Sequence, residues 1–233
     1  MEGAACAAAA GAGLLAYAVR APSSALLAPS VYRGARDRKA IALTFDDGPS
    51  ESTPELLDIL ERYRAPATFF QCGANVRRLP AVAKEVAARG HEIGNHTDTH
   101  PRLDFKSAAF IARELGAAQE SIERATGVRP RYFRAPYGVR WFGLRAAQRR
   151  YGLTGAMWTS IALDWKLPAD RVIPRLLRGA KNGAIFCLHD GRRLEARPNV
   201  QAMLETVRQL LPKLMEQGFH FEKVTDILCP TKS

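Results

Sequence analysis

Short apolar runs that resemble strands alternate with helical patterns along most of the chain, and this alternation restricts the fold more than any other feature. The strand-like runs cover residues 41–45, 67–70, 92–94, 132–133, 153–158, 184–188 and 220–224. The helical patterns begin near residue 52 and continue at residues 80–90, 107–125, 139–151, 169–180 and 200–217. Strands that alternate with helices predict a mostly parallel sheet with right-handed crossovers.

About seven such units in residues 39–228 favour an α/β fold, a distorted or incomplete (β/α) barrel of about seven strands in a single domain. A doubly wound open sheet is the competing topology. Six polar residues follow predicted strands, which favours the barrel because active sites of β/α folds lie at that end of the strands. These residues are Asp46, Asp47, His96, Arg134, Asp164 and His189.

Two adjacent carboxylates, Asp46 and Asp47, follow the first of these runs, and Gly48-Pro49 then ends it with turn-forming residues. Adjacent carboxylates repel each other unless a cation or an arginine compensates their charge. Asp before Gly-Pro is also ordinary turn material. The pair therefore becomes informative only together with other residues.

His96 and His100 are two of only five histidines and lie four positions apart. Pro101 disfavours helical geometry at His100, so we predict a short loop or turn rather than a long helix. Two imidazoles and the Asp47 carboxylate would form a three-ligand site with one position left for water, as catalytic zinc requires. An isolated pair of this spacing is weak evidence, because surface histidine pairs are common.

Five short motifs resemble, in the same order, those of the polysaccharide deacetylase family, also called the NodB-homology or carbohydrate esterase family 4 domain. The motifs are residues 44–48, 96–100, 134–138, 164–165 and 188–190, and the similarity runs from about residue 39 to about residue 228. Any one of them could arise by chance, whereas all five in order are highly specific. The resemblance implies a NodB-like barrel that hydrolyses N-acetyl groups on amino sugars of a polysaccharide or oligosaccharide.

The resemblance also implies a divalent metal held by Asp47, His96 and His100. Zinc is the expected ion, although two imidazoles and a carboxylate also accept Co²⁺, Ni²⁺, Fe²⁺ or Mn²⁺. Asp46 corresponds to the base that takes a proton from the attacking water, and Arg134 to the residue that orients this base.

His189 corresponds to the acid that protonates the leaving amine, and Asp164 to its hydrogen-bonding partner. The backbone N–H of Tyr137 would stabilise the oxyanion. Trp165 would offer an apolar face to a sugar ring, and Cys187 and Leu188 are expected to contact the substrate beside it.

Two positions depart from the family pattern. Ile161 stands where relatives carry an aspartate, and Cys187 stands where leucine commonly shapes the acetyl pocket. Neither change removes a ligand, the base or the acid, so we expect activity with a different substrate preference. Alternatives are a deformylase of a lipid-linked amino sugar, a hydrolase of a non-sugar amide such as a cyclic ureide, and a carbohydrate-binding pseudoenzyme.

The net charge of +11 indicates affinity for anionic partners such as envelope polymers or membrane surfaces, unless it reflects arginines spread over solvated faces. No aromatic-interleaved basic motif occurs, so a nucleic-acid partner is not expected. The four cysteines show no CxxC pair and demand no disulfide. Nothing in the sequence indicates the oligomeric state.

Residues 1–38 form an alanine-rich N-terminal segment, followed by the predicted deacetylase domain at residues 39–228 and a tail at residues 229–233. The stretch from Gly3 to Val19 carries no charge. We predict a signal sequence or a membrane-proximal anchor, and hence an exported or membrane-associated protein at the cell envelope. The alternative is an alanine-rich helix that packs on the barrel.

Overall fold

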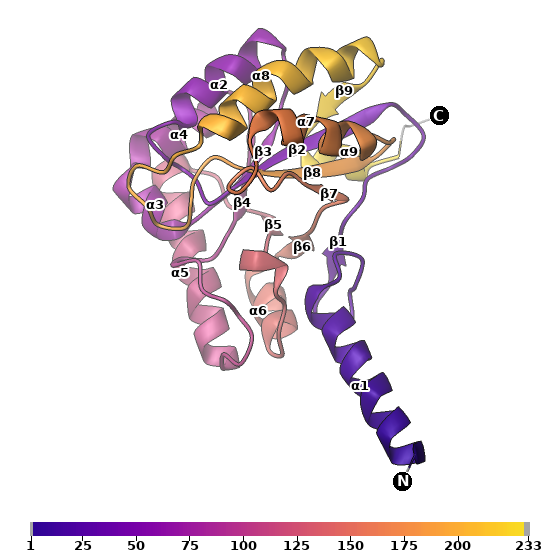
Figure 1. Cartoon of the computed structure of the whole chain (residues 1–233). Coiled ribbons are helices and arrows are strands. Elements are labelled where there is room, and N and C mark those ends of the chain that lie inside the picture. Colours follow the sequence, from indigo (N-terminus) through magenta and orange to yellow (C-terminus); the bar gives the residue numbers. More distant parts are fainter. Residues whose placement is uncertain (1, 231–233) are drawn as a thin grey trace.

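Strand β2 (Ala40–Asp46) is buried along its whole length and organises the sheet in the computed structural model, which describes residues 2–230. It pairs in parallel with β8 (Ala184–His189) over six positions, from Ile41 to Asp46. Its C-terminal half pairs with β3 (Thr68–Gln71) and its N-terminal half with β9 (His220–Glu222). Figure 1 shows these strands beneath a layer of helices.

The remaining strands extend this sheet in both directions, and every pairing is parallel. The order is β1 (Ser30–Val31), β6 (Thr154–Ala156), β5 (Tyr132–Phe133), β4 (Glu92–Asn95), β3, β2, β8 and β7 (Ser160–Ile161). Within residues 2–230, β1 and β7 end this order without pairing to each other, so the curled sheet does not close. The predicted distorted barrel is confirmed.

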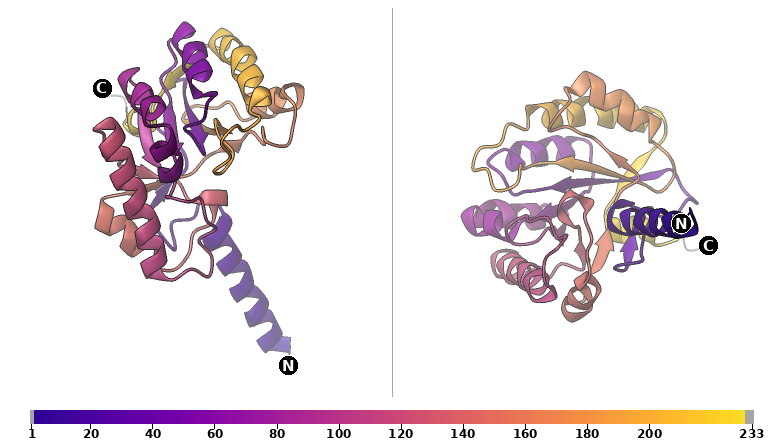
Figure 2. Two further views of the ribbon diagram at one scale, coloured as in Figure 1. Left: turned by 90° about the vertical axis from the view of Figure 1, so that its left-hand side faces the viewer. Right: turned by 60° about the horizontal axis from the view of Figure 1, so that its bottom comes forward.

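Helices connect the strands and cover the sheet, as the right-hand view of Figure 2 shows. They are α1 (Glu2–Arg20), α2 (Thr53–Arg62), α3 (Gly73–Arg78), α4 (Pro80–Ala88), α5 (Ala108–Thr126), α6 (Leu144–Tyr151), α7 (Ala169–Arg178), α8 (Gln201–Glu216), α9 (Val224–Leu228) and a 3-10 turn η1 (Pro136–Gly138). Helix α5 has both of its ends capped: the Ser107 hydroxyl accepts from Phe110 N, and left-handed Gly127 ends the helix.

Three predicted boundaries were wrong. The strand expected at residues 153–158 ends at Ala156. The helix expected from residue 139 begins only at Leu144, because η1 and the left-handed Gly143 come first. The last strand ends at Glu222 rather than at residue 224, where α9 begins. The prediction also missed β1 and β7, each of which pairs a serine with one apolar residue and so shows no apolar run.

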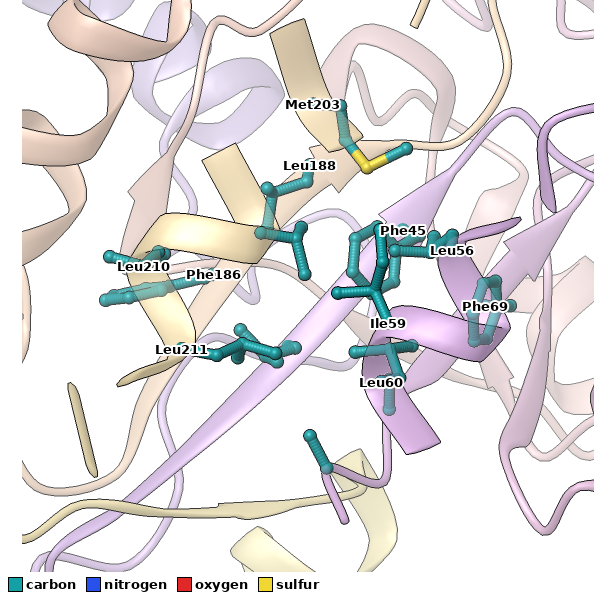
Figure 3. Packing of buried hydrophobic residues seen from close by; sticks show 14 of the residues in the cluster. Phe45, Leu56, Ile59, Leu60, Phe69, Phe186, Leu188, Met203, Leu210 and Leu211 are labelled. Carbon is teal, nitrogen blue, oxygen red and sulfur yellow. The ribbon is translucent and has the colours of Figure 1, made fainter. Parts of the chain in front are cut away.

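The largest core lies between the outer face of the sheet and the helices. Phe45 of β2, Phe69 of β3 and Leu188 of β8 pack there against leucines of α2 and α8 (Figure 3). Alternate residues of a strand point to opposite faces. The residues of β2 and β8 that point to the other face, such as Ala42 and Ile185, therefore belong to a separate apolar cluster inside the curled sheet.

The N-terminal helix α1 extends away from the domain (Figures 1 and 2). Its C-terminal end is anchored: Val19 is buried, and the buried Arg140 guanidinium donates to the backbone oxygens of Ala21 and Ser24, just beyond the helix. Leu14 is exposed. Within residues 2–230 no helix combines the length and the apolar character needed to cross a membrane.

The predicted domain boundaries stay predictions, although Ser30 and Val31, which precede residue 39, already pair with the sheet. The predicted tail falls mostly outside the described residues, because residues 231–233 are not among them.

The packing of α8 predicts a stability difference between two of its own apolar residues. Leu211 is 0% exposed in the main core, whereas Met215 is 47% exposed. We expect Leu211→Ala to lower the free energy of unfolding by about 2–5 kcal/mol, because it leaves a cavity. Met215→Ala should change it by less than about 0.5 kcal/mol. Urea denaturation monitored by circular dichroism measures both, and equal effects would contradict this packing.

Candidate active site

A cavity of about 430 Å³ opens where the strands end, and acidic and imidazole side chains line it. Asp46 is the last residue of β2, His96 follows β4, and His189 is the last residue of β8. Parallel strands bring their carboxyl ends to one edge. Residues that lie far apart in the sequence therefore meet there.

Asp46 and Asp47 both line this cavity, although neighbouring residues of a strand normally point to opposite faces. Asp47 lies just beyond the strand and is left-handed, with φ of 73°. This conformation is uncommon for a residue other than glycine. It breaks the alternation, so that Asp47 joins Asp46 instead of continuing toward the core behind Phe45.

Asp47, His96 and His100 offer one ligand atom each, and these atoms lie within 4.8 Å of one another. Asp47 Oδ1 is 3.2 Å from His96 Nε2 and 3.0 Å from His100 Nε2. Despite these distances the oxygen, which is buried, has no hydrogen-bond partner within the described part of the chain. Three buried donor atoms that converge in this way fit a divalent cation.

Neighbouring groups fix the direction of these ligands. His96 Nδ1 lies 2.8 Å from Arg134 O, so a proton on Nδ1 leaves the Nε2 lone pair facing the cavity. Asp47 Oδ2 accepts the backbone N–H of Arg193 at 2.8 Å. The Thr97 hydroxyl accepts the N–H of His100 at 3.1 Å. The predicted loop at residues 96–100 is confirmed, since none of these residues is helical.

The electrostatics of the triad also suit a metal. Burial alone would raise the pKa of Asp47, but the adjacent imidazoles of His100 and His96 hold this pKa well below its usual value. Burial lowers the pKa of His100, which outweighs the opposing effect of Asp47. Ionised carboxylate and neutral imidazole are the protonation states that bind a cation.

Arg134 lies beneath the acidic pair and is 0% exposed. Its Nη1 donates to Asp46 Oδ1 at 2.7 Å and to the Thr44 hydroxyl at 2.6 Å. Its Nε and Nη2 donate to the backbone oxygens of Ala156 and Met157. The arginine thus fixes one oxygen of Asp46, and Oδ2 remains as the oxygen that can accept a proton.

His189 and Asp164 form a second polar pair at the cavity. Asp164 Oδ1 lies 2.9 Å from His189 Nδ1, and Asp164 Oδ2 accepts the backbone N–H of His189 at 2.8 Å. Burial lowers the pKa of His189, but the charge and hydrogen bond of Asp164, together with the charges of Asp47 and Asp46, raise it to about 9. The imidazole is therefore poised to donate a proton from Nε2 near neutral pH.

The predicted substrate-binding residues differ in their placement. Tyr137 and Trp165 line the cavity and are 45% and 40% exposed. Tyr137 is left-handed (φ 57°), and its ring lies 4.8 Å from that of His100. Cys187 lines the cavity, whereas Leu188 is 0% exposed and packs in the main core (Figure 3). We therefore remove Leu188 from the expected substrate contacts.

The two departures from the family pattern both face the cavity. Ile161, at the end of β7, lines it beside Trp165. The Cys187 thiol is buried and lies 3.4 Å from Asp46 Oδ2, to which it donates a weak hydrogen bond. Cys187 therefore touches the expected base as well as the wall of the pocket.

Sequence reasoning missed the loop at residues 190–200, which follows β8 and contributes Arg193. The backbone N–H of Arg193 donates to Asp47 Oδ2. Asn75 Nδ2 donates to the backbone oxygens of Asp47 and Arg193, at 2.7 Å each. Backbone amides carry no residue-specific signal, so only the structure reveals this support.

A sequence model described as "Polysaccharide deacetylase" matches residues 33–156, which is more than half of the chain. The chain belongs to the polysaccharide deacetylase family. The resemblance derived from the five motifs is thereby confirmed.

Relatives within the polysaccharide deacetylase family cover most of the chain. A chitooligosaccharide deacetylase of Bradyrhizobium is 34% identical over 81% of this chain and 90% of its own length. A peptidoglycan-N-acetylglucosamine deacetylase of Listeria monocytogenes is 35% identical over 83% of this chain, but this match spans 40% of that longer protein. A solved wild-type CE4-family pseudoenzyme of Bacillus anthracis has a TM-score of 0.78 and 29% identity, covering 86% of this chain and 69% of that one.

The triad predicts tight and specific metal binding. We expect His100→Ala to weaken zinc binding by more than about 100-fold, because even loss of an outer partner of a metal ligand costs 10 to 100-fold. His220→Ala is the matched control, since His220 is exposed and pairs with Glu222. Competition with a chromophoric chelator measures both affinities. Equal zinc affinities of the two variants would reject this metal site.

Proposed function

We propose that this protein is a metal-dependent hydrolase that removes N-linked acetyl groups from amino sugars of a polysaccharide or oligosaccharide. The observation that carries the proposal is the arrangement of two polar pairs around the triad of Asp47, His96 and His100. Arg134 holds Asp46 on one side, and Asp164 holds His189 on the other. The names of the relatives point to the same chemistry.

A divalent cation held by the triad would acidify a water molecule and polarise the amide carbonyl. The ligand set fits zinc best and also accepts Co²⁺, Ni²⁺, Fe²⁺ or Mn²⁺. The residues of the chain supply the proton transfers and the positioning of the substrate.

Asp46 Oδ2 accepts the proton of the attacking water, while Arg134 keeps Oδ1 occupied and the carboxylate oriented. His189 then donates its Nε2 proton to the leaving nitrogen, so that the amine departs and acetate remains. The Asp164 carboxylate stabilises the imidazolium before this transfer. The backbone N–H of Tyr137 donates to the oxyanion in the transition state.

The walls of the cavity suit a sugar with a small acyl group. Trp165 lies edge-on to the His189 ring, with 4.5 Å between the ring centroids, and presents apolar surface beside the acid. Cys187 borders the acyl position next to Asp46. Sulfur is softer and smaller than the leucine it replaces, so acyl groups other than acetyl belong in the substrate tests.

An envelope glycan is the substrate class that we propose, and an exported or membrane-associated protein is the corresponding location. The peptidoglycan deacetylase among the relatives and the net charge of +11 support this choice. A carbohydrate-binding pseudoenzyme is less well supported, because this chain keeps the complete triad together with Asp46 and His189.

We expect the zinc-loaded protein to release acetate from N-acetylated chitooligosaccharides or peptidoglycan fragments, and Asp46→Asn to lower kcat by about 100 to 10,000-fold. Asparagine keeps an oxygen acceptor for Arg134 but no longer serves as a base. Enzymatic assay of acetate and formate measures the reaction, with Asp58→Asn as control because Asp58 is an exposed carboxylate on α2.

Three results would change this proposal. Formate release from formylated sugars alone would replace deacetylation by deformylation. Equal activity of Asp46→Asn and the wild type would remove Asp46 from the mechanism. Bound metal without release of either acid from any substrate would favour a binding role.

The His189–Asp164 pair predicts an alkaline limit of activity. His189 donates only when protonated, so kcat/KM should fall as the pH rises through its pKa of about 9. Asp164→Asn removes the carboxylate charge that raises this pKa, while an oxygen remains to accept from Nδ1. The alkaline limb should therefore move to lower pH. A pH profile of kcat/KM with an unchanged limb in Asp164→Asn would contradict this role.

A further inference from the structure

Asp46, Cys187 and His189 form a second group of metal-ligating side chains within the cavity. Each offers one donor atom, and the three atoms lie within 4.8 Å of one another. The group shares no residue with the triad of Asp47, His96 and His100. From this arrangement we propose that the protein contains a second, inhibitory site for zinc or another thiophilic metal ion, built from the base, the acid and the thiol between them.

Asp46 and His189 each have one polar atom held by a neighbour, so that the other is available to an ion. Arg134 binds Asp46 Oδ1, which leaves Oδ2, the oxygen 3.4 Å from Cys187 Sγ. Asp164 binds His189 Nδ1, which leaves Nε2. A carboxylate that holds the far nitrogen of an imidazole is the usual outer partner of a zinc-bound histidine.

Buried carboxylates surround the second group: Asp46, Asp47 and Asp164 are 3%, 5% and 7% exposed. Arg134 pairs with Asp46, and His189 pairs with Asp164. An ion that replaces the Nε2 proton of His189 would take over the compensation of charge that the imidazolium provides.

The donor set selects the kind of ion. One sulfur, one imidazole nitrogen and one carboxylate oxygen suit tetrahedral zinc or cadmium, with water as the fourth ligand. Thiolate ligands disfavour manganese and magnesium, which prefer oxygen. Binding releases the thiol proton to solvent, together with the Nε2 proton when His189 is charged, and the freed lone pairs bind the ion.

An ion at this site would block catalysis directly. It would occupy Asp46 Oδ2 and His189 Nε2, the two atoms that exchange protons with the substrate in the proposed mechanism. Zinc at the triad would then support activity, whereas further zinc would stop it. This consequence rests on the proposed function, while the existence of the second site does not.

The test uses the full chain with Cys6 and Cys229 replaced by serine, so that the buried thiols of Cys72 and Cys187 remain. In one titration, Cd²⁺ is added to the metal-free protein, and the ultraviolet absorption of cadmium–thiolate bonds is measured. In a second titration, Zn²⁺ is added to the metal-free protein in a calorimeter. We expect two equivalents to bind, with thiolate absorption belonging to one of them. Cys187→Ser should bind one equivalent and show no thiolate absorption.

Cys72→Ser is the matched control, because Cys72 is equally buried but belongs to neither ligand group. It should bind two equivalents. Cys187→Ala serves as a second variant if serine at this buried position prevents folding, which thermal melting reveals. A second equivalent that binds equally well to both Cys187 variants, or a single equivalent in the parent protein, would overturn the proposed site.

Activity provides an independent readout. Starting from protein with one equivalent of zinc, added Zn²⁺ should inhibit acetate release, and added Mn²⁺ should not. The activity of each protein is expressed relative to its activity with one equivalent of zinc. On this scale, the zinc concentration that inhibits Cys187→Ser should be at least about tenfold higher than the one that inhibits the parent. Equal inhibition of both would overturn the inhibitory role. If no substrate reacts but the cadmium result holds, the proposed function fails and the second site stands.

Discussion

The rest of the site depends on the hydrogen bonds and the ion pair that the buried guanidinium of Arg134 makes. Arg134 follows β5, and its side chain reaches Asp46 at the end of β2. Its other side-chain nitrogens donate to the backbone at the end of β6, and its carbonyl oxygen lies 2.8 Å from His96 Nδ1. A buried charge is costly unless hydrogen bonds and an opposite charge satisfy it. Arg134 has both, and the flat guanidinium also lies 4.1 Å from the centre of the Phe70 ring. One residue thus orients the expected base through its side chain, supports an expected metal ligand through its backbone, and connects three strands.

The interior of the curled sheet is arranged in layers around this arginine. At the amino-terminal end of β2, Ala40 and Ala42 belong to an apolar cluster. Thr44 comes next and accepts from Arg134, and Asp46 follows at the mouth of the cavity. These four residues alternate along β2, so they share its inner face. The inner face of β2 therefore becomes more polar from its apolar N-terminal end to the cavity, where Asp46 lies.

Much of the fold follows from the sequence because apolar strand-like runs alternate with helical patterns along residues 39–228. All seven predicted strand-like runs form strands, and residues that follow several of them, such as Asp47 and His96, line one cavity. The sequence could not show how Asp47 reaches the cavity, since that depends on one left-handed residue beyond the strand. It also could not show the amide of Arg193, because backbone donors leave no trace in residue identity. Strands β1 and β7 each contain one serine and one apolar residue, so no apolar run marks them in the sequence.

The alternation along β8 explains why neighbouring residues have such different consequences for function. Leu188 faces the helices and contributes to the main core, whereas Cys187 and His189 face the cavity. A change at Leu188 would act through packing and stability. Cys187 instead sets the chemistry beside Asp46. Where leucine would give the expected base an inert neighbour, this chain places a thiol beside it. In the mechanism that we propose, the geometry that prepares Asp46 and His189 for proton transfer also lets them share an ion with Cys187, so the free zinc concentration would determine activity.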